Sequence, residues 1–240
     1  METSRKIAIM QPYFFPYIGY WQLIKAVDVF VIYDVGKYIP HGWMHRNRVL
    51  GFDGVTPLQI DMTVSKASYN KAIFEMQRLI VPQKARKLEA TLQQRYRKAP
   101  YYDEAMKVIK PIIYDSEPDL VKYLTRLLKD ISSYQGLETR FALASEVPLD
   151  GLEHVEDRLF KICDWFGIKD YVNPIGGTQF YDKEVWKERG GVNLSFLKRD
   201  DDISYRQFKY DFVPDLSIID VMMFNSREEI AVLLDKYTLL

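Results

Sequence analysis

Short apolar runs that alternate with amphipathic stretches are the main pattern of this chain. Residues 7–10 and 29–33 are continuous apolar runs, which is typical of strands buried on both faces of a sheet. Between them, residues 17–26 place apolar side chains at helical spacing. A strand, a helix and a second strand in this order predict a right-handed parallel crossover unit over residues 6–34.

The rest of the chain continues with a hairpin, a run of helices and further strands. Asp53-Gly54 is a strong turn signal between strands expected at 46–50 and 55–62. A mainly helical region follows from about residue 71 to residue 134, with helices at 83–98, 101–114 and 119–134. Beyond it we expect strands at 139–144, 170–172 and 192–197, and helices at 155–166, 217–224 and 227–237.

These elements predict an α/β fold whose core is a parallel sheet. The repeated strand–helix–strand theme is Rossmann-like or nucleotidyltransferase-like. A length of 240 residues and a hydrophobic content of 48% are enough for one large core. We therefore expect a single α/β domain over residues 1–240, with a mainly helical insertion or subdomain at about 70–135.

Charge and composition narrow the classes of molecule that this protein is expected to bind. Basic and acidic residues both number 33, so the net charge gives no reason to expect nucleic-acid binding. No segment approaches the roughly 20 apolar residues of a membrane-spanning helix, and no signal peptide is apparent, so we expect a cytoplasmic protein without membrane insertion. The single cysteine, Cys163, lies on the apolar face of a predicted helix, and we expect it to be buried rather than reactive.

Candidate chemistry is expected beyond the carboxyl ends of the strands, where open α/β sheets bind their ligands. This rule selects residues 11–20, 34–48 and 145–154. In the first segment, Pro16 suits the first position of a helix, whose N-terminus can bind an anion such as phosphate. The alternative for Gly19 is a packing role. Nucleotidyltransferases carry His-x-Gly-His at this place, whereas this chain has Tyr17-Ile18-Gly19-Tyr20.

The second segment, residues 34–48, is rich in polar side chains of several types. Arg46 and Arg48 can clamp phosphate or carboxylate through their planar guanidinium groups. On a strand these two side chains share one face and Asn47 points to the other. The alternative is a solvated charged strand. His41 and His45 lack a third metal ligand nearby, so we predict no metal site.

Several strings of residues, in order along nearly the whole chain, resemble the WbqC-like protein family of bacteria. The first runs from Met10 to Trp21 and contains Gln11-Pro12-Tyr13-Phe14-Phe15-Pro16. The others are Asp28-Val29-Phe30, Gly42-Trp43-Met44-His45-Arg46-Asn47-Arg48, Ala144-Ser145-Glu146, Gly176-Gly177-Thr178-Gln179-Phe180-Tyr181, Tyr205-Arg206-Gln207 and Leu216-Ser217-Ile218-Ile219-Asp220. The family pattern has Asn more often than His at position 45, which argues against His45 as an essential catalyst.

The resemblance implies a role in O-antigen or related surface-polysaccharide biosynthesis. Members occur among the genes for these polysaccharides, and transfer of an amino acid, glycine in particular, to a sugar has been suggested. We expect a transferase that attaches an aminoacyl or acyl group to an amino sugar or nucleotide sugar. Such a reaction needs an activated carboxyl, so ATP or an acyl-carrier thioester is required. The alternative is a non-catalytic protein that binds a sugar nucleotide or a partner in the same pathway.

Combining the residue patterns with the resemblance assigns candidate roles. The candidate catalytic residues are Lys37, His41, Arg46 and Glu146. The candidate substrate-binding residues are Gln11, Tyr13, Tyr17, Gly19, Asp34, Trp43, Asn47, Arg48, Ser145, Tyr181 and Gln207. We expect a small-molecule substrate, a nucleotide sugar or an amino acid. The oligomeric state does not follow from the sequence.

Overall fold

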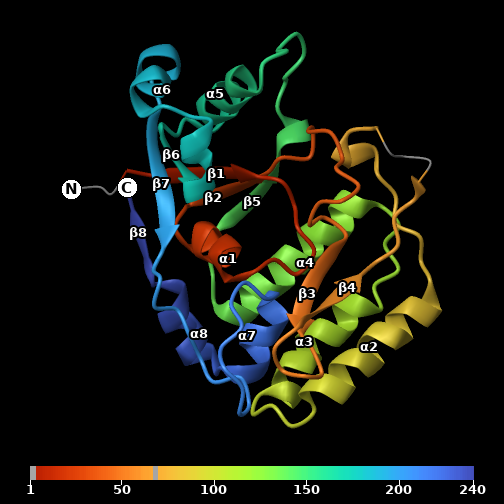
Figure 1. Cartoon of the computed structure of the whole chain (residues 1–240). Helices are drawn as coiled ribbons and strands as arrows, with labels where there is room; N and C mark the ends of the chain where they lie inside the picture. Colours follow the sequence, from red (N-terminus) through yellow and green to blue (C-terminus); the bar gives the residue numbers. More distant parts are fainter. Residues whose placement is uncertain (1–3, 67–69) are drawn as a thin grey trace.

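A six-stranded sheet forms the centre of the protein in a computed structural model, which describes residues 4–66 and 70–240 (Figure 1). Neighbouring strands are parallel except for the last pair, in which β8 runs antiparallel to β7. Across the sheet the strands are β5 (Arg140–Leu143), β2 (Val29–Ile32), β1 (Lys6–Met10), β6 (Asp170–Pro174), β7 (Asn193–Arg199) and β8 (Tyr237–Leu239). The predicted α/β class with a parallel-sheet core is confirmed.

The predicted crossover unit at the N-terminus is present as β1, α1 (Ile18–Lys25) and β2, with Ile7 opposite Val29 in a parallel ladder. The helix begins later than Pro16 suggests, and Tyr17 is its N-cap. The Pro16 carbonyl instead accepts hydrogen bonds from the Trp21 indole and from a backbone N–H of a distant segment. These contacts keep Pro16 in the preceding turn.

Both faces of the sheet are covered, as the continuous apolar strands predict. Alternate residues of β1 pack into two different cores: Ala8 faces one, while Ile7 and Ile9 face the other. On the Ile7 side lie α5 (Val155–Phe166), which ends at the expected Gly167, and α6 (Lys183–Gly190). On the Ala8 side lie α1, α4 (Leu120–Gln135), α7 (Ile218–Phe224) and α8 (Arg227–Leu234) (Figure 1).

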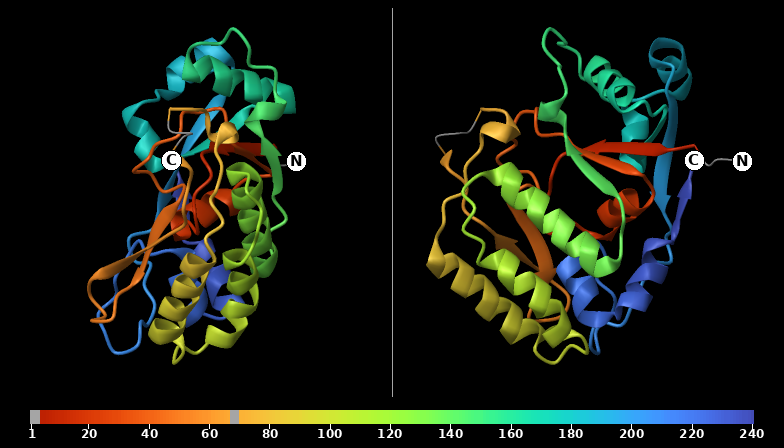
Figure 2. Two further views of the ribbon diagram at one scale, coloured as in Figure 1. Left: turned by 90° about the vertical axis from the view of Figure 1, so that its right-hand side faces the viewer. Right: turned by 180° about the vertical axis from the view of Figure 1, so that it is seen from behind.

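The segment between β2 and β5 contributes a hairpin and three helices (Figure 2). The hairpin is the expected one, with β3 (Arg46–Leu50) antiparallel to β4 (Pro57–Asp61). The expectation of a helical region from about residue 71 is wrong for its first part. Only a short 3-10 turn, η2 (Ile73–Glu75), precedes the helices α2 (Pro82–Tyr96), α3 (Tyr102–Ile113) and α4. Residues 76–81 are held extended because Gln77 and Arg78 form bridges to Asp119 and Val64.

Two elements near the C-terminus differ from expectation. The last helix ends at Leu234 rather than at 237, and the following residues form edge strand β8 against β7. The sequence does not predict the helix α6. Its residues are mostly polar, and Trp186 is its one deeply buried side chain. Among the described residues, no helix combines the length and the apolar character needed to cross a membrane.

Candidate functional site

The carboxyl end of β1 lies at the point where the strand order of the sheet reverses. The chain passes from β1 to β2 and β5 on one side, and later returns to place β6 and β7 on the other side. Ligands of open α/β sheets bind in the crevice at such a point. Two cavities occupy this position, and both are lined by Met10 at the end of β1 and Pro174 at the end of β6.

Side chains from outside the turn at residues 11–16 hold it in place by donating hydrogen bonds to its carbonyl groups. Buried carbonyls need such partners, because an unpaired one costs free energy comparable to a lost hydrogen bond. The donors are Tyr20 Oη to Gln11 O (2.8 Å), Asn47 Nδ2 to Phe14 O (2.9 Å) and Phe15 O (2.7 Å), Ser217 Oγ to Phe15 O (2.8 Å) and Trp21 Nε1 to Pro16 O (2.9 Å). This scaffold holds Phe15 in a left-handed conformation (φ 44°).

Four aromatic side chains line the smaller cavity, of about 390 Å³. They are Tyr13 from the turn, Tyr17 and Tyr20 at the start of α1, and Trp43 from the loop before β3. Burial raises the pKa of Tyr13 and of Tyr17, so both phenols stay neutral hydrogen-bonding groups near pH 7. Gly19 is needed for close packing here, because a Cβ at this position would lie 2.6 Å from the Tyr17 ring.

Trp43 organises the two arginines of β3. The guanidinium carbons of Arg46 and Arg48 lie 5.7 Å and 5.3 Å from its ring centroid, so both share one face of the strand as expected. Arg46 is engaged with the carbonyl groups of His41 and Gly42 and does not line either cavity. Arg48 lines the smaller cavity, and its buried Nε has no hydrogen-bond partner among the described residues. Of the two, Arg48 is the one placed to bind an anion.

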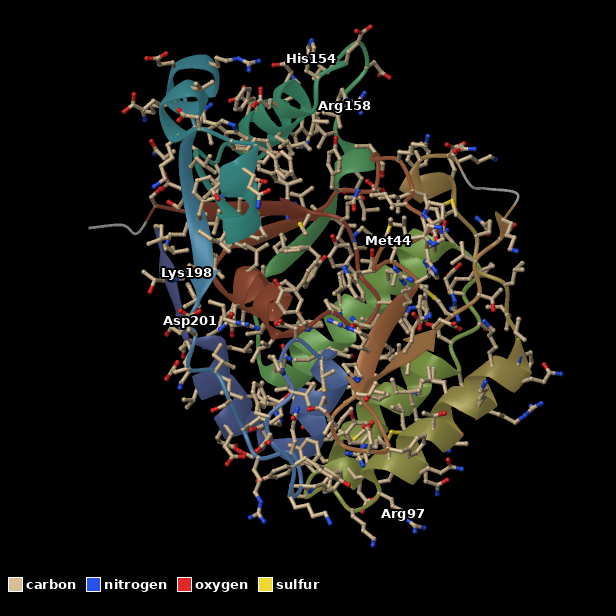
Figure 3. The ribbon with its side chains drawn as sticks, in the orientation of Figure 1. Met44, Arg97, His154, Arg158, Lys198 and Asp201 are labelled. Atoms are coloured by element: carbon tan, nitrogen blue, oxygen red, sulfur yellow. The ribbon has the colours of Figure 1, made fainter. Side chains whose placement is uncertain are left out.

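The larger cavity, of about 700 Å³, shares Met10 with the smaller one, and several polar side chains stand in its mostly apolar wall. The side-chain amides of Gln11 and Asn173 both line it, and neither makes a hydrogen bond within the described part of the chain. Lys37 follows β2, and Arg158 extends from α5, where Figure 3 labels it near the top of the molecule. These groups can bind hydroxyls, carboxylates or phosphates.

The loops after β2 and β5 contact each other, and this contact is structural. The Asp34 carboxylate accepts hydrogen bonds from the Ser145 backbone N–H (2.9 Å) and from its Oγ (2.6 Å). Asp34 is fully buried, and burial raises the pKa of its carboxyl group. This pair joins two neighbouring parallel strands at their carboxyl ends. Neither residue lines the two cavities, and the adjacent Glu146 does not line them either.

The candidate residues therefore divide into two groups. Those that line the cavities are Gln11, Tyr13, Tyr17, Gly19, Lys37, Trp43, Asn47, Arg48 and Tyr181. Those that do not are Asp34, His41, Arg46, Ser145, Glu146 and Gln207. Gln207 is fully buried, and its Nε2 donates to the Asp220 carboxylate (2.7 Å), so its contacts are internal to the protein.

Sequence reasoning missed several cavity residues that follow or precede β6. Asn173, at the end of β6, and the turn at 174–177 lie where the same strand-end rule would have placed them. The segments predicted from the sequence follow the first, second and 139–144 strands only. Tyr33 has a buried hydroxyl without a hydrogen-bond partner in the described part of the chain, and it lines the larger cavity. No sequence signal separates this tyrosine from a packing residue.

His45 and the acidic residues give no sign of a metal centre. The ring of His45 is hydrogen-bonded to Tyr38 Oη (2.7 Å), and burial lowers the pKa of the imidazole. Within residues 4–66 and 70–240, side chains of His, Cys, Asp and Glu do not gather into a group of three that can hold a metal ion.

Cys163 is buried in the core, as expected, and is unsuited to nucleophilic chemistry. Burial raises the pKa of its thiol to about 12. Because the thiolate is the reactive form, we predict that the native protein does not react with an aromatic disulfide reagent at about pH 8. The thiol should react at once after denaturation, which absorbance of the released thiolate can follow. Rapid reaction of the native protein would contradict this placement.

Comparison with known proteins agrees with the resemblance seen in the sequence. The sequence model of the WbqC-like protein family matches residues 11–232. This range contains the polar residues that line both cavities. The uncharacterized protein Rv1507c of Mycobacterium tuberculosis (strain ATCC 25618 / H37Rv) is 29% identical over 228 residues, covering 94% of this chain and 95% of that protein. No solved structure matches the chain significantly. The chain belongs to the WbqC-like protein family.

Proposed function

We propose that this protein is a transferase that attaches an aminoacyl group, such as glycyl, or another acyl group to an amino sugar or nucleotide sugar in bacterial O-antigen or surface-polysaccharide synthesis. The observation that carries the proposal is the pair of cavities that share Met10 and Pro174 at the reversal point of the sheet. Two adjoining cavities can hold two reactants with their reacting ends at the common wall. Their volumes of about 390 and 700 Å³ are those of small-molecule sites.

The smaller cavity suits the nucleotide part of a nucleotide sugar. The Trp43 and Tyr13 rings offer faces on which a base can stack. The Arg48 guanidinium, whose Nε is unpaired within the described part of the chain, can donate to a phosphate. The first turn of α1 borders the same cavity and has no acidic residue and no side-chain cap. Its free N–H groups and helix dipole add a further attraction for a phosphate.

The larger cavity suits the sugar and the acyl donor. The amides of Gln11 and Asn173 can each donate and accept, as recognition of sugar hydroxyls requires. Lys37 and Arg158 provide positive charge for a carboxylate or phosphate of the donor. Asp215, the acidic residue of the smaller cavity, is paired with Arg199, so the joint site favours anionic ligands.

The lining residues favour direct transfer over a covalent enzyme intermediate. Neither cavity is lined by Cys, Ser, Thr or His among the described residues, so the usual nucleophiles of acyl transfer are missing from the walls. In direct transfer the acceptor amine attacks the donor carbonyl and forms the C–N bond. The bond to the leaving group, a phosphate or a thiolate, breaks and its electron pair stays with that group, which takes up the proton released by the amine. Lys37 can stabilise the oxyanion, which for one well-placed donor contributes about 3–4 kcal/mol.

Direct transfer predicts how kinetics and variants behave. Initial rates with both substrates should give intersecting double-reciprocal lines, since both must be bound before reaction. Lys37→Gln should lower kcat by about 100-fold with a small change in KM, because its interaction forms in the transition state. Lys107→Gln, an exposed lysine on α3, is the matched control and should leave both constants unchanged.

A sugar-nucleotide-binding protein without catalytic activity is the second candidate, and the absence of a nucleophile in the described cavity walls favours it. A thermal-shift screen with nucleotides, nucleotide sugars, amino acids and acyl donors separates the two, since a ligand of the native state raises Tm. Binding of a nucleotide sugar that is lost in Arg48→Gln, together with turnover, supports the transferase. The same binding without turnover of any donor supports the binding protein. No shift by any nucleotide at millimolar concentration contradicts both.

A further inference from the structure

A third cavity, of about 770 Å³, lies far from the sheet, where the C-terminal end of α2 meets the loop at residues 206–210. Arg97, one of its lining residues, is at the opposite end of the molecule from Arg158 in the larger sheet cavity (Figure 3). The proposed transferase reaction does not use this cavity. Its size is again that of a small-molecule site.

Positive charge dominates the walls of this cavity. Its cationic lining residues are Arg95, Arg97, Lys98, Arg206 and Lys209, and its described lining contains no aspartate or glutamate. None of these five side chains forms an ion pair with any carboxylate of the described residues. In a chain with equal numbers of basic and acidic residues, such a concentration of unpaired cations is a local feature. Several cations in a cavity with low-dielectric walls attract an anion.

Arg95 is the least accessible of these cations and the one with unmet hydrogen bonds. Its side chain is only 9% exposed, yet Nε and Nη2 are buried and find no acceptor within the described part of the chain. The guanidinium carbon lies 5.0 Å from the Phe208 ring centroid and 5.6 Å from that of Tyr210. Buried donors without acceptors are costly, so a ligand that supplies acceptors gains the hydrogen bonds that the protein leaves unmade.

The loop that closes the cavity is held by contacts within the protein. Arg206 Nε donates to Phe208 O (3.0 Å), and Phe208 has a left-handed backbone conformation (φ 52°). Gly54, in the β3–β4 turn, makes room for the Tyr210 ring, which a Cβ would approach to 2.2 Å. Phe208, Tyr210 and Phe224 line the cavity as an apolar wall. A preorganised loop reduces the entropy cost of binding.

We propose that this cavity is a binding site for an organic diphosphate or triphosphate, separate from the two cavities at the sheet. Guanidinium groups bind phosphate oxygens through paired hydrogen bonds, and several cations are needed to match two or three phosphate groups. A single carboxylate would leave most of the five cations unpaired. The aromatic wall provides a surface for the organic part of the ligand, such as a nucleoside.

Calorimetric titration of the full chain with inorganic diphosphate and with ADP tests this site. We expect both to bind the wild type, with ADP binding more tightly than diphosphate because of the aromatic wall. Arg95→Gln should raise the Kd of both at least tenfold. Because a buried substitution can disturb folding, the exposed pair Arg97→Gln and Lys98→Gln provides a second test and should raise Kd similarly.

Two controls locate the binding. Arg86→Gln changes an exposed arginine on the same helix α2 and should leave Kd unchanged. Arg48→Gln removes the phosphate-binding group proposed for the smaller sheet cavity, and in this background diphosphate should still bind to the third cavity and should still lose at least tenfold in affinity on Arg95→Gln. Failure of the proposed transferase function would therefore not affect this result. The proposal is overturned if diphosphate does not bind, if the Arg95 and Arg97/Lys98 variants bind as the wild type does, or if only long polyanions such as single-stranded RNA are retained.

Discussion

Replacing Asp220 with alanine should lower the free energy of unfolding by about 3–5 kcal/mol. Asp220 is fully buried on α7, and its carboxylate accepts hydrogen bonds from Tyr96 Oη (2.6 Å), Tyr205 Oη (2.9 Å) and Gln207 Nε2 (2.7 Å). Alanine would leave three buried donors without their acceptor. It would also remove the negative charge within electrostatic range of the buried Arg95 guanidinium.

Urea denaturation measures this loss, and single-donor variants calibrate it. Tyr205→Phe removes one donor together with its own need for a partner, so it should cost only about 1 kcal/mol. Asp220→Asn keeps the shape and one acceptor oxygen, and it should fall between the two. A loss for Asp220→Ala no greater than that for Tyr205→Phe would show that the network contributes little to stability.

The Asp220 network also has a consequence for the sheet cavities. Tyr96 Oη accepts from the backbone N–H of Leu50 (2.9 Å) at the end of β3, which fixes the strand that carries Arg48. Ser217, the N-cap of the same helix α7, binds both Phe15 O and, through its backbone, Arg48 O (2.8 Å). Destabilising α7 should therefore weaken ligand binding at the smaller cavity as well as folding.

The elements that the sequence predicted correctly are those in which local pattern and tertiary packing agree. The α5 helix has an apolar stripe at helical spacing and a glycine at its end, and the structure has it at Val155–Phe166 as expected. In contrast, β8 is three residues at the sheet edge, and its strand conformation depends on pairing with β7. The extended conformation of residues 76–81 likewise depends on the bridges of Arg78 to Val64 and of Gln77 to Asp119. Neither partner is near these residues in the sequence.

The position of the candidate site followed from strand order, but the roles of its residues did not. Polar residues in a strand-end loop serve either a ligand or the loop itself, and the two uses look alike in one sequence. Asn47 and Arg48 are neighbours in the sequence. The Asn47 amide donates to the turn at 11–16, whereas the buried Nε of Arg48 has no hydrogen-bond partner among the described residues. Gln207 and Asp34 are similarly committed to internal hydrogen bonds.

The Asn47→Asp substitution should cost about 3–5 kcal/mol of stability at pH 7 and should abolish binding at the smaller cavity. Asn47 is 5% exposed, and its Nδ2 donates to both Phe14 O and Phe15 O. Aspartate has the same shape and keeps the Oδ1 acceptor for the Arg48 backbone N–H, but it faces the two carbonyl oxygens with a third oxygen. Buried without a cationic partner, its carboxyl group should have a pKa well above the usual value of about 3.9.

Because of this raised pKa, the effect of Asn47→Asp on the free energy of unfolding depends on pH, whereas the effect of a simple loss of packing does not. A group whose pKa is higher in the folded state contributes its stability below the unfolded pKa and loses it as pH rises through the folded pKa. The difference in unfolding free energy between wild type and Asn47→Asp should therefore widen from about pH 4 to about pH 8, because only the protonated acid can donate to a turn carbonyl. Asn70→Asp, at an exposed position, should show no such trend. A pH-independent difference for Asn47→Asp would mean that its amide does not hold the Gln11–Pro16 turn in solution, and the aromatic cavity built on that turn would need another support.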